Sequence, residues 1–270
     1  HMAIWSPPVP DHYWMLDAPA IISRVNTLAP VSKWLAPVAT GENGERRIVM
    51  GDDCSVMWPM GYSGLNIECR PAIMKEYYGR FPGALIETDC PPPEDVPLKM
   101  KKHGVPPALD FLKIDVDSFE CEFLDEIMKA GAKPIVIAME LQPGFPPPLM
   151  FMLNRSREQS MANFVWEHLH HSPFFGCSLQ MAVEILKSYK YTLVQYVVED
   201  GWFVRDEFAH LFNFGRDTLM EYRLGNPNEY GAHRWDSRQK FEKLKALQHN
   251  PKEMLSMAQG YVTEYAQNNP

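Results

Sequence analysis

The sequence predicts an α/β protein with a mostly parallel β-sheet, helices on both faces and an antiparallel hairpin near the C-terminus. Short apolar segments alternate with helix-like segments between about residues 45 and 140, which indicates βαβ units with right-handed crossovers. The apolar run 111–114 ends in a carboxylate, Asp115, as a buried strand does at the mouth of a site. Segments 191–198 and 202–205 flank Glu199-Asp200-Gly201, which is a strong hairpin signal.

The individual elements follow from local signals. Asp17 as N-cap and Pro19 in the first turn predict a helix over 17–35. The proline-rich segment 142–148 cannot continue a helix or a central strand, so we expect a loop over the strand ends. Periodicity predicts the remaining elements: strands at 48–50, 64–68, 84–87, 109–115 and 134–140, and helices at 71–78, 94–103, 120–130, 160–170, 178–189, 237–247 and 251–265.

These elements predict three parts of the chain. Residues 1–44 form an N-terminal extension with a helix, residues 45–210 form the sheet domain, and residues 211–270 form a C-terminal helical extension. The C-terminal helices either pack on the domain or form a homodimer surface, and both alternatives stay open.

The composition excludes several classes of function. The net charge of -8 and the lack of a basic stripe argue against a nucleic-acid partner. No apolar run approaches the roughly 20 residues that cross a bilayer, so no membrane partner is expected. The five cysteines are widely spaced and form no C-x-x-C, which disfavours a disulfide framework or a zinc site. We therefore expect a cytoplasmic location, although His1-Met2 resembles a cloning remnant, so a native leader could have been removed.

Several phrases, taken in order, resemble the FkbM-like class I S-adenosylmethionine-dependent methyltransferases. The phrase Lys-Ile-Asp-Val-Asp at 113–117 resembles that family's K-I-D-V-D/E-G segment, and 137–143 resembles its V-I-E-Y-N-P strand end. Segments 62–68, 174–179 and 191–206 also resemble parts of the family, so the likeness covers about residues 45–208. The resemblance implies a Rossmann-like methyltransferase sheet that binds S-adenosylmethionine.

The first loop departs from the family pattern, which is normally glycine-rich. Here residues 51–55 read Gly-Asp-Asp-Cys-Ser, so Gly51 stays at the turn while later glycine positions carry side chains. Glycines in such loops let the backbone approach a ligand closely. Two interpretations remain: a reshaped cofactor loop in which Gly51, Asp53 and Ser55 bind the cofactor, or a non-catalytic binding protein on a methyltransferase fold.

Three acidic residues at predicted strand ends are candidates for cofactor binding. Glu68 suits the ribose hydroxyls, although a solvated acid paired with Arg70 is the alternative. The resemblance implies that Asp89 contacts the adenine amino group, whereas a simple turn before Pro91 is the alternative. Asp115 would bind the methionine end of the cofactor, or would be structural.

The same strand ends predict catalytic groups and a metal site. Asp115, Asp117 and Glu140 form an oxygen ligand set suited to Mg²⁺ or another divalent cation, or one of them serves as a base. Asp117 as a helix cap is the alternative. His171, after His170, is a candidate base, although histidines at helix ends are more often surface caps.

Together these features predict methyl transfer from S-adenosylmethionine to an oxygen of a small metabolite or sugar-derived acceptor. Transfer to nitrogen stays open. An NAD-dependent oxidoreductase is the third hypothesis, which the missing G-x-G-x-x-G and the closing hairpin disfavour.

Overall fold

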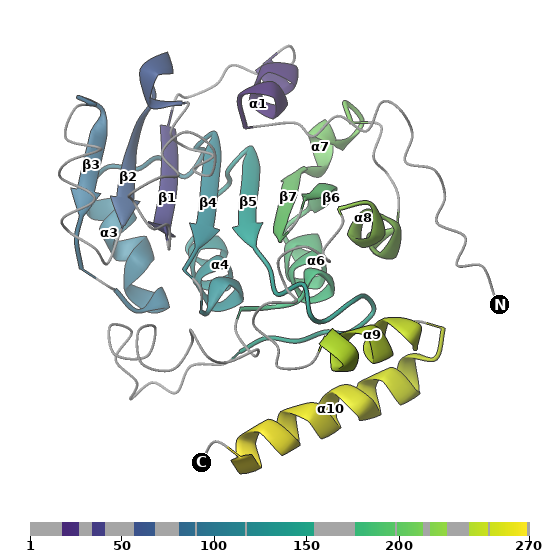
Figure 1. The fold of residues 1–270 in the computed structure, drawn as a ribbon. Coiled ribbons are helices and arrows are strands. Elements are labelled where there is room, and N and C mark those ends of the chain that lie inside the picture. Colours follow the sequence, from purple (N-terminus) through teal and green to yellow (C-terminus); the bar gives the residue numbers. More distant parts are fainter. Residues whose placement is uncertain are drawn as a thin grey trace.

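The structure is a computed structural model, and its centre is a seven-stranded sheet in the order β3-β2-β1-β4-β5-β7-β6 (Figure 1). It describes residues 18–26, 34–40, 57–67, 81–89, 91–116, 118–153, 176–197, 199–212, 217–225, 238–247 and 249–268. The strands are β1 (Trp34–Thr40), β2 (Ser63–Ile67), β3 (Ala84–Glu87), β4 (Phe111–Asp115), β5 (Val136–Glu140), β6 (Tyr191–Val197) and β7 (Asp200–Arg205).

Helices precede, connect and follow these strands. In the described part they are α1 (Ala18–Asn26), α3 (Val96–Lys102), α4 (Glu120–Lys129), α6 (Leu179–Ser188), α7 (Asp206–Ala209), α8 (Thr218–Leu224), α9 (Arg238–Ala246) and α10 (Pro251–Asn268). Two short 3-10 helices are also present in this part of the chain: η1 (Trp58–Met60) comes before β2, and η3 (Pro93–Asp95) comes just before α3. Ser178 caps α6 by accepting a hydrogen bond from the backbone N–H of Met181, as expected of serine at that position.

The pairing of the strands confirms the predicted sheet in part. β1 pairs in parallel with β2 and β4, β2 pairs in parallel with β3, and β4 with β5. β7 pairs antiparallel with both β5 and β6. The described strands therefore form a mostly parallel sheet that ends in a C-terminal antiparallel hairpin.

The first strand is where the prediction is wrong. The helix predicted over 17–35 ends at Asn26, and residues 34–40 form β1 between β2 and β4. Pro37 lies within this central strand, opposite Lys113, although proline is normally confined to edge strands and bulges. The strand predicted at 48–50 and the helices predicted at 71–78 and 160–170 lie outside the described residues.

Side chains of the strands alternate between two apolar cores, one on each face of the sheet. Leu112 of β4 and Ile137 of β5 belong to the core that packs against α3, α4, α6 and α8. Phe111 and Val136 belong to the other core, which includes residues of α1 and α7. Helices therefore cover both faces, as predicted.

The C-terminal helices α9 and α10 lie beyond the carboxyl ends of β4 and β5 (Figure 1). Leu244 of α9 and Met254 and Ala258 of α10 are buried together with Phe145 and Leu149, which belong to the loop after β5. The expected loop over the strand ends is thus present, and the C-terminal helices pack on it. None of the described helices, α10 included, has the length and apolarity to span a bilayer.

A disulfide contradicts the expectation drawn from the cysteine pattern. Cys121 at the start of α4 is bonded to Cys177, which comes just before α6. The two residues are 56 positions apart, so only the fold reveals that they meet. Because disulfides persist mainly in oxidising compartments, the cysteines no longer support a reducing one. Cys54, Cys69 and Cys90 lie outside the described residues.

Candidate functional site

Acidic residues gather where β4 and β5 end and β7 begins. Asp115 is the last residue of β4, and Glu140 is the last residue of the neighbouring β5. Glu140 in turn is paired with Asp200, the first residue of the antiparallel β7. Ligands of open α/β sheets bind at this carboxyl edge. The structure therefore brings two of the predicted site residues, Asp115 and Glu140, to adjacent strand ends, and adds Asp200.

A buried lysine, which sequence reasoning missed, links two of these acids. Lys113 is only 3% exposed. Its Nζ lies 2.7 Å from Oδ1 of Asp200 and 3.4 Å from Oδ2 of Asp115. Its register partner on the intervening β5 is Ala138, whose small side chain lets the lysine stem cross that strand toward β7. The signal in the sequence was a lone lysine inside an apolar run.

The charges of the side chains described at this edge favour a cation. Asp115, Glu140 and Asp200 carry three negative charges and Lys113 carries one positive charge, so these four side chains sum to -2. Glu140 is 5% exposed, and the side chain of Asp115 is 17% exposed. Attraction between charges is stronger in such partly desolvated places than in open water. The edge is therefore chemically suited to a ligand that carries an ammonium or a sulfonium group.

Two stacked tyrosines support the loop that follows β5. Tyr196 of β6 and Tyr222 of α8 stack with ring centroids 5.7 Å apart. The hydroxyl of Tyr222 donates to the carbonyl oxygen of Pro143 in this loop. Burial raises the pKa of Tyr196 well above its usual value, and the nearby Tyr222 and acidic side chains add to the effect. The hydroxyl group of Tyr196 therefore stays protonated and the side chain neutral.

The turn between β4 and α4 is held by Glu120, which is 1% exposed. Its Oε1 accepts hydrogen bonds from the backbone N–H groups of Val116 and Ser118. The backbone N–H of Gly176 donates to the carbonyl oxygen of Ser118, and the adjacent Cys177 forms the disulfide with Cys121. The backbone that leaves Asp115 is thus tied to the start of α6.

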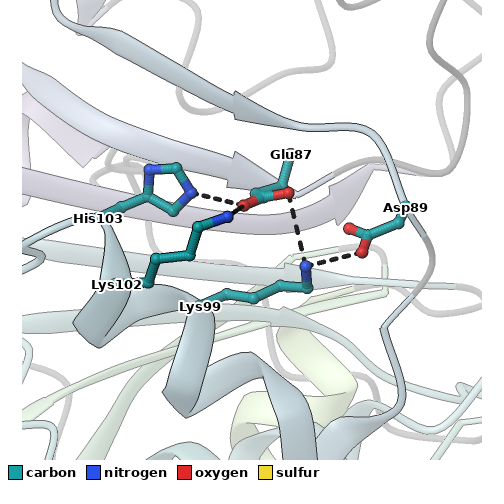
Figure 2. A network of polar contacts seen from close by, with 5 residues as sticks. All are labelled: Glu87, Asp89, Lys99, Lys102 and His103. Carbon is teal, nitrogen blue, oxygen red and sulfur yellow. Dashed lines mark hydrogen bonds and ion pairs between the residues drawn. The ribbon is translucent and has the colours of Figure 1, made fainter.

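After the edge strand β3, Asp89 is exposed and pairs with a lysine. Figure 2 shows Lys99 between Glu87 and Asp89, with Nζ 2.7 Å from Oδ2 of Asp89. Lys102 and His103 contact Glu87 at 2.8 and 2.6 Å. Hydrogen bonds from Lys102 and His103, together with the charge of Lys99, lower the pKa of Glu87 to about 2 despite its partial burial. An adenine amino group would therefore share Asp89 with Lys99.

The other predicted site residues lie outside the described part of the chain: Gly51, Asp53, Ser55, Glu68, Asp117 and His171. The proposed metal set of Asp115, Asp117 and Glu140 is therefore described only in part. Among the residues that are described, no three His, Cys, Asp or Glu side chains group as metal ligands do.

The end of β1 adds a second candidate segment for the cofactor loop. β1 lies between β2 and β4, so its carboxyl end is the point where the strand order reverses, and cofactors bind beside that point. The segment after β1 begins at residue 41 and carries Gly41 and Gly44 in its sequence. Sequence reasoning assigned this role to Gly51, because it expected the first strand at 48–50. Gly41, Gly44 and Gly51 all lie outside the described residues, so the assignment of Gly51 stays a prediction.

A surface hollow of about 370 Å³ lies at the opposite, amino edge of β5. Its lining includes Lys133 after α4, Lys190 after α6 and Arg205 at the end of β7. Because the strand ends rather than the size of a hollow position ligands in this architecture, we place the candidate site at the carboxyl edge. The segment 41–56, which follows β1, lies outside the described residues. So does the segment 154–175, which precedes α6.

Comparisons with known proteins leave the function to be argued from these residues. No protein-family model matches the sequence, and no curated protein matches it either. The chain is similar to the solved structure of the plantazolicin methyltransferase BamL in complex with a triazolic desmethylPZN analog and SAH. The likeness covers 81% of this chain and 76% of that chain at 8% identity, with a TM-score of 0.36.

Proposed function

We propose that this protein transfers a methyl group from S-adenosylmethionine to an oxygen atom of a small metabolite or sugar-derived acceptor. The sheet supports the proposal, because parallel strands followed by an antiparallel hairpin are what the resemblance to FkbM-like class I methyltransferases implies. The observation that carries it is the acidic carboxyl edge. There Asp115 and Glu140 end adjacent strands beside the reversal of strand order, where a cofactor with a sulfonium and an ammonium group would find opposite charge.

The proposed chemistry requires the protein to align the acceptor oxygen with the methyl group and to remove a proton from the acceptor. S-adenosylmethionine supplies an electrophilic methyl group when it is bound, so catalysis comes from orienting the acceptor oxygen and accepting its proton. Asp115 would bind the methionine end of the cofactor. Glu140 or His171 would accept the proton. The loop after β5, held by Tyr222 and the C-terminal helices, would cover the acceptor.

A divalent cation on Asp115, Asp117 and Glu140 is the second element of this proposal. Carboxylate oxygens are suitable ligands for Mg²⁺. The ammonium of Lys113, however, lies 3.4 Å from Oδ2 of Asp115, and it would compete with a metal for that oxygen. Glu140 and Asp117 would then have to supply most of the binding.

The non-catalytic alternative depended on the loop at Gly51. Since β1 ends at Thr40, the segment that follows the central strand carries Gly41 and Gly44. The altered glycine pattern at 51–55 is therefore a weaker reason to expect loss of cofactor binding, and we favour the enzyme.

Isothermal titration of the purified chain with S-adenosylmethionine and S-adenosylhomocysteine, with and without Mg²⁺, tests the proposal. We expect micromolar binding of both ligands, followed by methyl transfer in a screen of hydroxylated acceptors. A well-folded protein that binds neither ligand would overturn the assignment. Stabilisation by NAD alone would favour the oxidoreductase hypothesis instead.

Three expectations about partners and location are kept as proposals: a small-molecule acceptor rather than nucleic acid or membrane, a homodimer, and a cytoplasmic location. The Cys121–Cys177 disulfide argues against the cytoplasmic location, because disulfides persist mainly in oxidising compartments. Leu255 and Val262 of α10 are 47% and 39% exposed, and they are the residues through which a dimer of C-terminal helices would pack. Sedimentation of the full chain and Leu255→Ser would test the dimer.

A further inference from the structure

Lys99 of α3 contacts two acids at the carboxyl end of the edge strand β3. Its Nζ lies 2.7 Å from Oδ2 of Asp89 and 3.5 Å from Oε2 of Glu87, the last residue of the strand (Figure 2). The side chain of Lys99 is only 17% exposed, although that of Lys102 in the same helix is 67% exposed. Lys99 therefore lies between the strand end and the segment that follows it.

The two acids depend on Lys99 to different degrees. Glu87 has Lys102 and His103 as further partners, both at its Oε1. Asp89 is 58% exposed, and no second side chain among the described residues forms a hydrogen bond or ion pair with it. The hydrogen bond with Asp89 is also the largest of the effects that raise the pKa of Lys99, so the ammonium stays charged. Loss of Lys99 would therefore leave Glu87 paired and Asp89 without an ionic partner.

The second oxygen of Asp89 can accept a hydrogen bond from a ligand. Lys99 donates to Oδ2, and within the described ranges Oδ1 accepts no hydrogen bond. Both oxygens of a carboxylate are acceptors, so one can bind a lysine while the other binds a ligand. An exposed side chain loses rotamer freedom when it binds, which costs free energy. Because Lys99 already orders Asp89, less of this cost falls on ligand binding.

Asp89 follows the strand toward which the adenosine part of the proposed cofactor would extend. Asp115, which would bind the methionine end, ends β4, while Glu140 and the loop after β5 lie on the side proposed for the acceptor. The adenosine part then extends in the other direction, past β1 and β2 to β3. Three strand spacings separate β4 from β3, which is about 14 Å. An extended nucleoside joined to an amino acid can span that length.

We infer that Lys99 is a positioning residue for the adenine end of the cofactor: it fixes Oδ2 of Asp89, so that Oδ1 accepts a hydrogen bond from the exocyclic amino group of adenine. This inference rests on the proposed function. Lys99 acts through Asp89 and does not touch the cofactor. Recognition of the amino group therefore depends on a residue of α3, and not on Asp89 alone.

The test compares S-adenosylhomocysteine with its 6-deamino analogue, in which hydrogen replaces the amino group of adenine. Isothermal titration gives the ratio of the two affinities. In the wild type S-adenosylhomocysteine should bind about tenfold more tightly, because the analogue loses a hydrogen bond to a charged group. Lys99→Met removes the charge but keeps most of the side-chain length, and it should lower the ratio to about threefold or less. A general loss of structure would weaken both ligands equally and leave the ratio unchanged.

Lys102→Met is the matched control. Lys102 belongs to the same helix and the same network, but it pairs with Glu87 and not with Asp89, so this variant should keep the wild-type ratio. Lys99→Arg should restore most of the ratio, since a guanidinium group can also donate to Oδ2 of Asp89. If Lys99→Met does not fold, Lys99→Gln replaces it, and the same fall in the ratio is expected because its side chain is shorter and uncharged.

The outcomes separate the inference from the proposed function. Wild-type protein that binds neither S-adenosylmethionine nor S-adenosylhomocysteine would overturn both. Wild-type protein that binds S-adenosylhomocysteine and its 6-deamino analogue equally well would overturn the inference alone, because the amino group would then not be recognised. A ratio that stays at the wild-type value in Lys99→Met, or that falls as far in Lys102→Met, would overturn it in the same way.

Discussion

Gly176 leaves the space that the buried carboxylate of Glu120 occupies. A Cβ atom added at residue 176 would lie 2.8 Å from Oε2 of Glu120, and the backbone of Gly176 has a φ of +61°. Glu120 holds the turn after Asp115 through Val116 and Ser118. The absence of a side chain at residue 176 therefore helps to shape the backbone beside the candidate site.

Replacing this glycine should destabilise the protein for two separable reasons. Gly176→Ala adds the cost of a positive φ, about 1 kcal/mol, to the displacement of Glu120. Gly131→Ala is the matched control, because Gly131 has a φ of +92° with no atom near its added Cβ. Chemical denaturation should show a larger loss for Gly176→Ala. Equal losses would mean that Glu120 moves aside at no cost.

The Cys121–Cys177 disulfide should contribute to stability by restricting the unfolded chain. The pair closes a loop of 56 residues, for which chain entropy gives about 4 kcal/mol as an upper value. A reducing agent should lower the melting temperature of the wild type and leave Cys121→Ala/Cys177→Ala unchanged. Mass spectrometry of unreduced peptides should find the two cysteines linked. Free thiols at both positions in the folded protein would contradict the pairing.

The network around Glu87 predicts how stability changes in acid. Its partners lower the pKa of Glu87 from 4.5 to about 2, so the contribution is complete above about pH 4.5 and is lost as the pH falls toward 2. The magnitude should be about 1 kcal/mol or less, because Lys102 is 67% exposed. Glu87→Gln should therefore be less stable than wild type at pH 6, with the difference shrinking by pH 2.5. A pH-independent difference would contradict the network.

Two acids should differ in which part of the cofactor they recognise. Asp115→Asn should weaken binding of S-adenosylhomocysteine by at least about tenfold, with little effect on methylthioadenosine, because the latter has no ammonium. Asp89→Asn should weaken both ligands, since both contain adenine. Isothermal titration measures both affinities. If Asp115→Asn weakened both ligands equally, Asp115 would not bind the methionine end.

Strong local signals predicted most of the described fold. The apolar runs that became β4 and β5 lie where expected. The hairpin of β6 and β7 was also expected, but Asp200 and Gly201, which were predicted to be part of its turn, belong to β7. β1 was missed because a helix was predicted through residue 35 and the first strand at 48–50, whereas β1 spans Trp34–Thr40. The candidate site was predictable only where it follows strand ends, as at Asp115 and Glu140. Contacts across the fold, such as Lys113 with Asp200, 87 residues apart, leave no local pattern in the sequence.

The packing of α9 and α10 on the loop after β5 affects how the chain should be handled in the laboratory. Shortening the C-terminus to aid crystallisation would uncover Phe145 and Leu149, which Leu244, Met254 and Ala258 now bury. An assay on such a shortened protein would then report on a disturbed loop after β5 rather than on the intact protein. Purification tags therefore belong at the N-terminus.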